Sequence, residues 1–327
     1  LQNDDRRRET HTILADHFAT IIDEQLSGPL SERGTAFDDF RGKATELLHQ
    51  LRSTGDRDRL VKRLSSIPFF SALFQGETLY IVLRSWRELD EVDIAQTYLS
   101  SLEEWEMGGR PIEERRDALQ RLSRLFEVVG RLGASLEMCE RLRTIANESS
   151  DTRQLAAAEV RIGWIHHLRG AGDAALEHTR NALELAESMD DQRTMASAIG
   201  NMGVMYRSRG EYQEALECYG RQYELAEQLG DSLLRCNAVG NMGAAYLHAG
   251  DLDHALQQIT RQRSIARELH DRQSLSMAIG NLGIVHLHRG DLDGALESFN
   301  EQLAIDQELG DRKGIAMTLD NIGAIHS

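Results

Sequence analysis

Apolar and polar residues alternate along this chain with the spacing of amphipathic helices, and the pattern is organised in units of 40 residues. The motif Gly-Asn-Met/Leu-Gly begins at positions 200, 240 and 280, and Asp-Asn-Ile-Gly follows at 320. A Gly-acidic pair followed by Ala-Leu recurs from 210, 250 and 290, and a third motif ends in Asp at 231, 271 and 311. Three motifs in one register over several copies indicate an internal repeat, which is typical of a stacked array.

Each motif has a physical role in a helix-turn-helix unit. In the copy that starts at Ala196, we expect helix A over about 197–209 and helix B over about 212–229. Gly210 ends helix A in the left-handed region, and Asp231 caps the next helix A. Gly203 and Ala215 are small residues that let the two backbones pack closely. One pair of helices cannot bury its apolar face alone, so the stack is the folding unit.

The repeat weakens toward the N-terminus but keeps its phase. Gly163, Gly170 and Ala175 mark one full copy, and Gly130 marks a weaker one. Before about residue 76 the register is lost, although apolar spacing still indicates helices. We therefore expect an irregular helical N-terminal or capping segment at 1–75, degenerate repeats at 76–155, and regular repeats at 156–327, the last one truncated.

Charge and cysteine content narrow the classes of function. Lys and Arg number 37 and Asp and Glu 53, so the net charge is −16, and such a chain repels nucleic acid and anionic membranes. No apolar run is long enough to span a membrane, and no signal peptide is visible. Three cysteines without metal-site spacing predict free thiols in a reducing, cytoplasmic compartment: Cys139, Cys218 and Cys236.

The motifs resemble the tetratricopeptide repeat (TPR). With Ala196 as position one, Gly203 and Ala215 occupy the small positions eight and twenty of the usual repeat. A 40-residue unit, about six residues longer than the usual repeat, is similar to kinesin light chains, Leu-Gly-Asn-repeat spindle adaptors and bacterial signalling proteins. The usual Pro at the end of helix B is missing, and the Asn-Met/Leu-Gly motif is unusually regular. The resemblance implies an all-α fold: a right-handed α-solenoid of antiparallel helix pairs, or TPR superhelix.

In such arrays helix A lines a concave surface, so the resemblance implies a set of groove residues. These candidate partner-binding residues are Arg161, Trp164, His167, Asn201, Arg207, Asn237, Asn241, His248, Asn281, His288 and Asn321. Helical geometry supports the grouping, because positions two, six, nine and thirteen of the repeat share one stripe. A row of Asn amides about 10 Å apart could donate to and accept from the backbone of an extended peptide.

Each of these assignments has an alternative. The Asn amides could instead bond across repeats and hold the superhelix together, and their recurrence does not decide between binding and structure. Arg161 and Arg207 would favour acidic ligands in a groove, or they could lie on a solvated helix face.

The sequence carries no signal for catalysis, a cofactor or a metal site. His166 and His167 are adjacent and point apart on a helix, and His248 and His288 lie one repeat apart. No phosphate-binding or nucleophile motif occurs, and neither Cys218 nor Cys236 has a visible base partner.

The sequence therefore predicts a protein–protein interaction module that holds a peptide or a partner segment in the concave groove of the superhelix. The alternative is the sensor or regulatory domain of a larger signalling protein, in which the array gates an effector domain beyond residue 327. A free-standing enzyme is the least favoured hypothesis. Binding to nucleic acid or to a membrane is not expected, and self-association is compatible with such an array.

Overall fold

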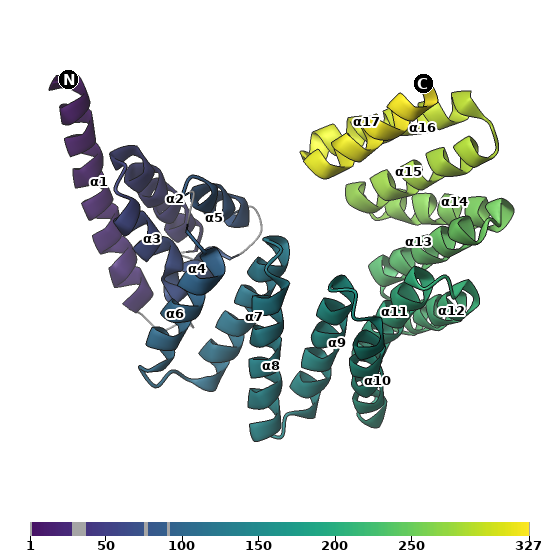
Figure 1. The fold of residues 1–327 in the computed structure, drawn as a ribbon, viewed down its shortest axis with the longest axis horizontal. Helices are drawn as coiled ribbons and strands as arrows, with labels where there is room; N and C mark the ends of the chain where they lie inside the picture. The colour runs from purple at the N-terminus through teal and green to yellow at the C-terminus, as the bar shows by residue number, and fades with distance from the viewer. Residues whose placement is uncertain (1, 28–36, 75–77, 90–91, 327) are drawn as a thin grey trace. The chain divides into compact units, whose positions relative to one another are not determined.

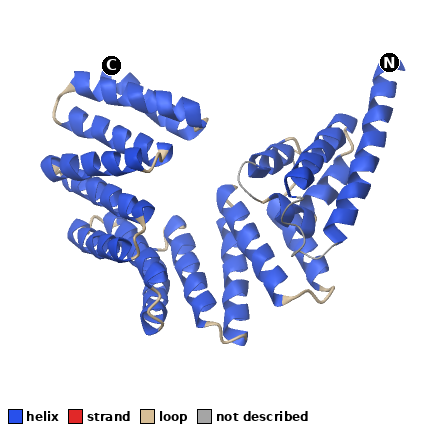
Figure 2. Cartoon of the chain, turned by 180° about the vertical axis from the view of Figure 1, so that it is seen from behind, coloured by secondary structure: helices blue, strands red, loops and turns tan. Residues whose placement is uncertain are grey.

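The computed structural model describes residues 2–27, 37–74, 78–89 and 92–326 (Figure 1). Within these ranges all regular structure is helical and no strand occurs (Figure 2). The helices are α1 Gln2–Ser27, α2 Phe37–Thr54, α3 Arg57–Ser65, α4 Ile67–Leu73, α5 Thr78–Arg87, α6 Ile94–Glu106, α7 Ile112–Val128, α8 Leu132–Glu148, α9 Thr152–Leu168, α10 Gly172–Ser188, α11 Gln192–Ser208, α12 Tyr212–Gln228, α13 Ser232–Ala249, α14 Leu252–Glu268, α15 Arg272–His288, α16 Leu292–Leu309 and α17 Arg312–His326.

The chain divides into two compact units. Unit 1 comprises Leu1–Ile145 and unit 2 comprises Ala146–Ser327. The predicted boundaries at 75/76 and 155/156 separate segments by the regularity of the repeat and not by compactness. That division stays a prediction.

Unit 2 is the regular part of the molecule. Its helices α9–α17 follow one another as antiparallel pairs, each packed on the next, in the expected right-handed α-solenoid (Figure 1). The A helices are α9, α11, α13, α15 and α17, and the B helices are α10, α12, α14 and α16. Successive A helices also contact one another, from α9 through α11 and α13 to α15.

Local signals set the helix ends in unit 2. Gly210 has φ +79° after α11, and the Asp231 carboxylate accepts from Leu234 N at 3.0 Å at the start of α13, as predicted. The predicted start of helix A near residue 197 is wrong, because Asp191 caps the helix and α11 begins at Gln192.

Small residues let the paired helices approach in unit 2. A Cβ on Gly203 would lie 2.5 Å from the ring of Tyr219, which is fully buried between α11 and α13. Ala215 and Ala245 complete this contact, with Met242 half-buried against it. The role predicted for the small residues at 203 and 215 is therefore confirmed.

Unit 1 closes around large aromatic rings. Tyr98 of α6 lies 4.9 Å from Phe70 of α4 and 5.5 Å from Trp86 of α5, measured between ring centroids. Its hydroxyl donates to Leu64 O of α3 at 2.8 Å and accepts from Trp86 Nε1 at 3.3 Å. One side chain thus joins four helices, and its burial raises the pKa of Tyr98 far above its usual value.

Candidate functional site

A groove of about 720 Å³ runs along the A helices of unit 2, a size within the range of known ligand pockets. Helices α9, α11, α13 and α15 provide most of its surface, and two glutamines of α12 and α14 complete it. Its lining is Trp164, Gly200, Asn201, Val204, Arg207, Gln222, Asn237, Gly240, Asn241, Ala244, Leu247, His248, Gln262, Met277, Asn281, Ile284 and His288.

The structure brings most of the predicted site residues together in this groove. Those on its lining are Trp164, Asn201, Arg207, Asn237, Asn241, His248, Asn281 and His288. Three others, Arg161, His167 and Asn321, lie outside the lining. His167 is nevertheless close, because its ring centroid lies 5.4 Å from that of Trp164. Arg161 is on α9 and Asn321 on α17, at the two ends of the array of A helices.

Four asparagine side chains on the groove lining form no hydrogen bonds between repeats. For Asn201, Asn237, Asn241 and Asn281, the structure has no side-chain hydrogen bond to another described residue. All four are at least partly accessible. Their donors and acceptors are therefore not used by the helices that carry them.

Two glutamine side chains of helix B reach the groove at positions where the neighbouring helix A carries a glycine and has no Cβ. Gln222 of α12 and Gln262 of α14 lie against Gly200 of α11 and Gly240 of α13, and a Cβ on either glycine would overlap the glutamine amide. Gln222 is 6% exposed and Gln262 is 3% exposed. Each side-chain oxygen Oε1 is buried and has no hydrogen-bond partner among the described residues.

The repeat pattern in the sequence did not point to Gln222 and Gln262 as groove residues. They lie on helix B, which the resemblance places away from the concave surface. A signal was present, because Gln recurs at 222, 262 and 302, in step with Gly at 200, 240 and 280. The 40-residue spacing alone did not show that each glutamine side chain crosses the neighbouring helix A beside its glycine.

Arg207 is the cation of the groove lining. It forms no ion pair with a described carboxylate, and its Nε is buried without a hydrogen-bond partner. Burial, and to a lesser extent the nearby Arg207 guanidinium, lowers the pKa of both His167 and His248. No Asp or Glu lines the groove, although the whole chain holds 53 of them.

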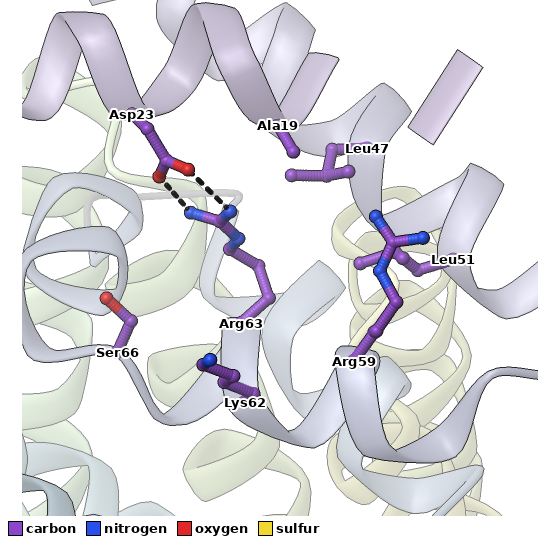
Figure 3. Close-up of a pocket in the computed structure, with 8 residues that line it drawn as sticks. All are labelled: Ala19, Asp23, Leu47, Leu51, Arg59, Lys62, Arg63 and Ser66. Carbon is purple, nitrogen blue, oxygen red and sulfur yellow. Dashed lines mark hydrogen bonds and ion pairs between the residues drawn. The ribbon is translucent and has the colours of Figure 1, made fainter. Parts of the chain in front are cut away.

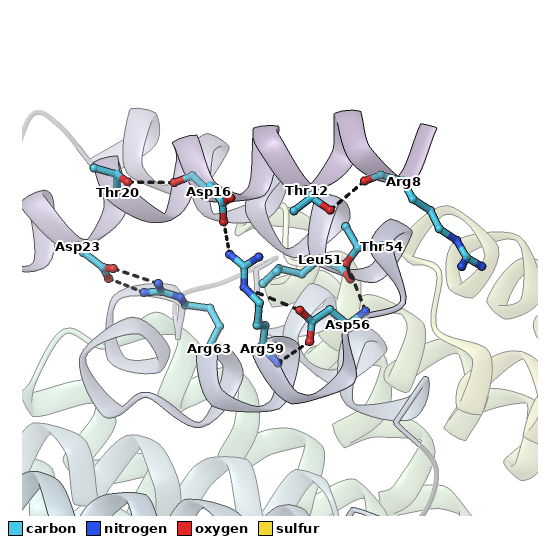
Figure 4. A network of polar contacts seen from close by, with 10 residues as sticks. All are labelled: Arg8, Thr12, Asp16, Thr20, Asp23, Leu51, Thr54, Asp56, Arg59 and Arg63. Carbon is cyan, nitrogen blue, oxygen red and sulfur yellow. Dashed lines mark hydrogen bonds and ion pairs between the residues drawn. The ribbon is translucent and has the colours of Figure 1, made fainter. Parts of the chain in front are cut away.

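A second pocket, of about 420 Å³, lies in unit 1 between α1, α2 and α3. Figure 3 shows Arg59, Lys62 and Arg63 of α3 on one side and Asp23 of α1 opposite. Arg63 donates to both carboxylate oxygens of Asp23 at 2.6 and 3.1 Å. Arg59 donates to Asp16 at 2.6 Å, and its Nε forms an ion pair with Oδ2 of Asp56 at 4.0 Å (Figure 4). Both arginines of this pocket are thus neutralised by carboxylates of the same unit.

Other chemistry is not assembled in the part of the chain that the structure describes. No group of three or more His, Cys, Asp and Glu side chains is placed to hold a metal ion there. None of the three cysteines forms a disulfide, and burial raises the pKa of Cys218 and Cys236, which disfavours the nucleophilic thiolate. None of the described helices combines the length and the apolar character needed to cross a membrane.

Sequence models of known families match three stretches of the chain. Residues 194–268 and 278–313 match models of the tetratricopeptide repeat. Residues 116–205, which overlap the less regular copies, match the model of anaphase-promoting complex subunit 5. No curated protein sequence matches the chain.

Solved structures with a similar fold include a Rap protein, a quorum sensor and a protein with a tetratricopeptide repeat sensor. A Rap protein complexed with competence and sporulation factor is 15% identical with a TM-score of 0.51, and the match covers 98% of each chain. The apo quorum sensor NprR from B. thuringiensis is 13% identical with a TM-score of 0.53, covering 89% of this chain and 81% of that one. A STAND (signal transduction ATPase with numerous domains) protein with a tetratricopeptide repeat sensor, from Pyrococcus horikoshii, is 12% identical with a TM-score of 0.52. That match covers 98% of this chain and 52% of the other. At these identities the likeness is one of fold.

Proposed function

Since the chain carries tetratricopeptide repeats, we propose that it is a protein-interaction module that binds a peptide or a partner segment in the groove of unit 2. The occupant lies along the A helices α9, α11, α13 and α15. Its role is to hold another molecule, with no chemical step on that molecule.

The unused amides carry this proposal. Four Asn side chains line one groove and make no hydrogen bond to the described residues. A peptide backbone offers a carbonyl and an N–H at each residue, which matches the donor and the acceptor of each amide. The alternative role, bonding across repeats to hold the superhelix, would require partners that these amides do not have in the structure.

The test removes two adjacent amides. A displayed library of random peptides is selected on the full chain, and the affinity of a selected peptide is measured by fluorescence anisotropy. Because each hydrogen bond contributes about 1 kcal/mol, Asn201→Ala combined with Asn241→Ala should weaken binding by roughly 30-fold. The melting temperature should stay nearly unchanged.

The matched control is Asn300→Ala. Asn300 is on α16 outside the groove, and its amide donates to Leu296 O at 2.8 Å. It should leave affinity unchanged. If the double variant instead loses stability and keeps its affinity, the Asn row is structural and the proposed site is wrong.

A second candidate function is that of a sensor or regulatory domain within a larger signalling protein. The match over 98% of this chain to about half of a STAND protein with a tetratricopeptide repeat sensor favours it. The full-length gene tests it, because a catalytic or DNA-binding segment beside these repeats would support gating by the groove. In that case the ligand should change the activity of the adjoining segment.

A further inference from the structure

Helix α17 exposes a face that the equivalent helices of the array bury. The face follows the spacing i, i+3, i+4, i+7 of one helix side and comprises Ala316, Leu319, Asp320 and Gly323. All four residues are exposed, and none of them lies on the groove lining. Forty residues earlier, on α15, the equivalent residues are all buried: Ser276, Ile279, Gly280 and Gly283. The equivalent face is also buried on α11 and α13.

The packing of α16 on α15 shows what kind of helix covers this face. A Cβ on Gly283 would lie 2.6 Å from the ring of Phe299. A Cβ on Gly280 would lie 2.5 Å from the amide of Gln302. The covering helix therefore contributes one large side chain and, three residues later, one polar side chain. Helix α12 covers α11 in the same way.

On α17 the space for the large side chain is present and empty. Gly323 is the counterpart of Gly283, and a Cβ on it would meet nothing within 4 Å. Glycine inside a helix is about 1 kcal/mol less favourable than alanine, and on α15 the close approach of a ring offsets that loss. One turn before Gly323, Leu319 is 50% exposed and adds apolar surface. This part of the face fits an aromatic or large aliphatic side chain.

Asp320 changes the chemistry of the second contact. It occupies the position that is Gly200, Gly240 and Gly280 in the three preceding copies. A side chain there would overlap a glutamine amide placed as on α15, so a covering helix with glutamine at this point does not fit. Asp320 is exposed and forms no ion pair with a described residue. A carboxylate in this place favours a covering helix with Lys or Arg where the others have glutamine.

Charge also indicates where such a helix comes from. The helices that cover the other copies carry no basic residue at this position, which is Ala182, Gln222, Gln262 or Gln302. A second copy of the chain therefore does not supply the partner of Asp320 from these helices, and its net charge of −16 would repel the first copy. A basic helix of another protein is attracted by the same charge.

We propose that α17 docks a basic amphipathic helix of another protein, which packs on it as α16 packs on α15. An aromatic or large aliphatic side chain of that helix fills the space beside Gly323. A Lys or Arg three residues later pairs with Asp320. This surface is separate from the groove and goes beyond the proposed function.

The probe is a displayed library of 18-residue helices built on the sequence of α16. The positions of Phe299, Gln302 and Asp306 are randomised, and the library is selected on the full chain. Selected helices are made as peptides and their affinities are measured by fluorescence anisotropy. Circular dichroism of each free peptide shows whether affinities are compared at equal helix content, since isolated helices of this length are marginal. The expected result is a large apolar residue at the first position and Lys or Arg at the second.

Two variants test the two contacts. Gly323→Leu should weaken binding by at least about tenfold, because its side chain fills the space of the incoming ring. At this exposed position it should leave the melting temperature equal or higher. Asp320→Lys should weaken binding of the basic helices by about tenfold and favour helices with Glu at the second position instead. A merely structural role of Asp320 would not reverse this preference.

The chain offers a matched control for each variant. Gly220→Leu introduces the same side chain on α12, where nothing lies within 4 Å of the new Cβ. Glu297→Lys makes the same change of charge at an exposed position of α16. Both positions lie outside this face and outside the groove lining, so both variants should bind the selected helices as the wild type does.

Three outcomes would overturn the proposal. The first is that no helix is selected, or that selected helices lack a basic residue at the second position. The second is binding that survives Gly323→Leu but is lost in Asn201→Ala combined with Asn241→Ala, since the helix would then occupy the groove and the proposed function would stand. The third is self-association of the wild type, measured by sedimentation velocity, that Gly323→Leu abolishes, since the occupant would then be a second copy.

Discussion

The groove of unit 2 and the pocket of unit 1 both contain arginine side chains, but these are paired with carboxylates only in unit 1. In unit 1, Arg59 and Arg63 are paired with Asp16 and Asp23 from α1. In unit 2, Arg207 has no carboxylate partner, and the oxygens of two buried glutamines have no donor. The arginines of the first region join the unit's own helices, whereas Arg207 in the second forms no ion pair with a described residue.

The two units also differ in how they pack. Unit 1 gathers Phe70, Trp86 and Tyr98 around one point, so its helices are held apart by large rings. Unit 2 places Gly and Ala at the closest approaches of its helices. An array with small residues at regular intervals repeats the same geometry, and repetition is what aligns its A helices into a continuous groove.

The largest predicted effect tests the packing of unit 2. Gly203→Val should destabilise the chain by about 1–3 kcal/mol, because the added side chain overlaps the buried ring of Tyr219. Thermal and urea denaturation followed by circular dichroism measure the change. The control is Gly220→Ala on α12, where nothing lies within 4 Å of the new Cβ. It should stabilise the helix by about 0.5–1 kcal/mol. A Gly203→Val variant as stable as the wild type would show that close approach does not determine this geometry.

The next effect compares the two kinds of arginine. Arg63→Met should destabilise unit 1 by about 1 kcal/mol, because it removes a two-bond contact with Asp23. Arg207→Met should leave stability unchanged or raise it slightly, because no ion pair is lost and a buried Nε is removed. Salt at 1 M should reduce the difference, since it screens the pair in unit 1. Equal losses in the two variants would break the comparison, because Arg207 would then be a structural residue.

The smallest effect concerns pH. Folding lowers the pKa of His167 and His248, so below the ordinary His pKa of about 6.5 the unfolded chain binds more protons than the folded one. Stability therefore falls as the pH is lowered through this window and is regained above it. His167→Gln combined with His248→Gln should flatten the decline between pH 7 and pH 5, measured as melting temperature against pH. An unchanged profile would mean that other groups determine the decline.

Sequence patterns predicted much of unit 2 because its signals are local. A left-handed Gly210 and the capping Asp231 act within a few residues of themselves, and both were assigned correctly. The predicted start of helix A near residue 197 is too late because the repeat is counted from Ala196, whereas the capping residue Asp191 lies five positions upstream. The register gave no such guide before about residue 76, where contacts such as that of Tyr98 with Leu64 join residues 34 positions apart.

The candidate site was predictable only in part. The row of groove amides follows from helical spacing together with the family resemblance, and eight predicted residues do line one groove. That these residues bind a partner stays a prediction. Gln222 and Gln262 could not be assigned from sequence, because their access to the groove depends on the path of a side chain across a different helix.

The sequence by itself determined the helical repeat, its turns and caps, and the stripe of residues that A helices present, since each depends on short-range backbone preferences and a fixed period. Only the tertiary structure decided which polar groups are already satisfied. Pairing is a property of distance between residues far apart in the chain: Asp23 reaches Arg63 across 40 positions, while Arg207 reaches no described carboxylate. That difference separates Arg59 and Arg63 of unit 1, which are paired with carboxylates, from Arg207 of unit 2, which forms no ion pair with a described carboxylate.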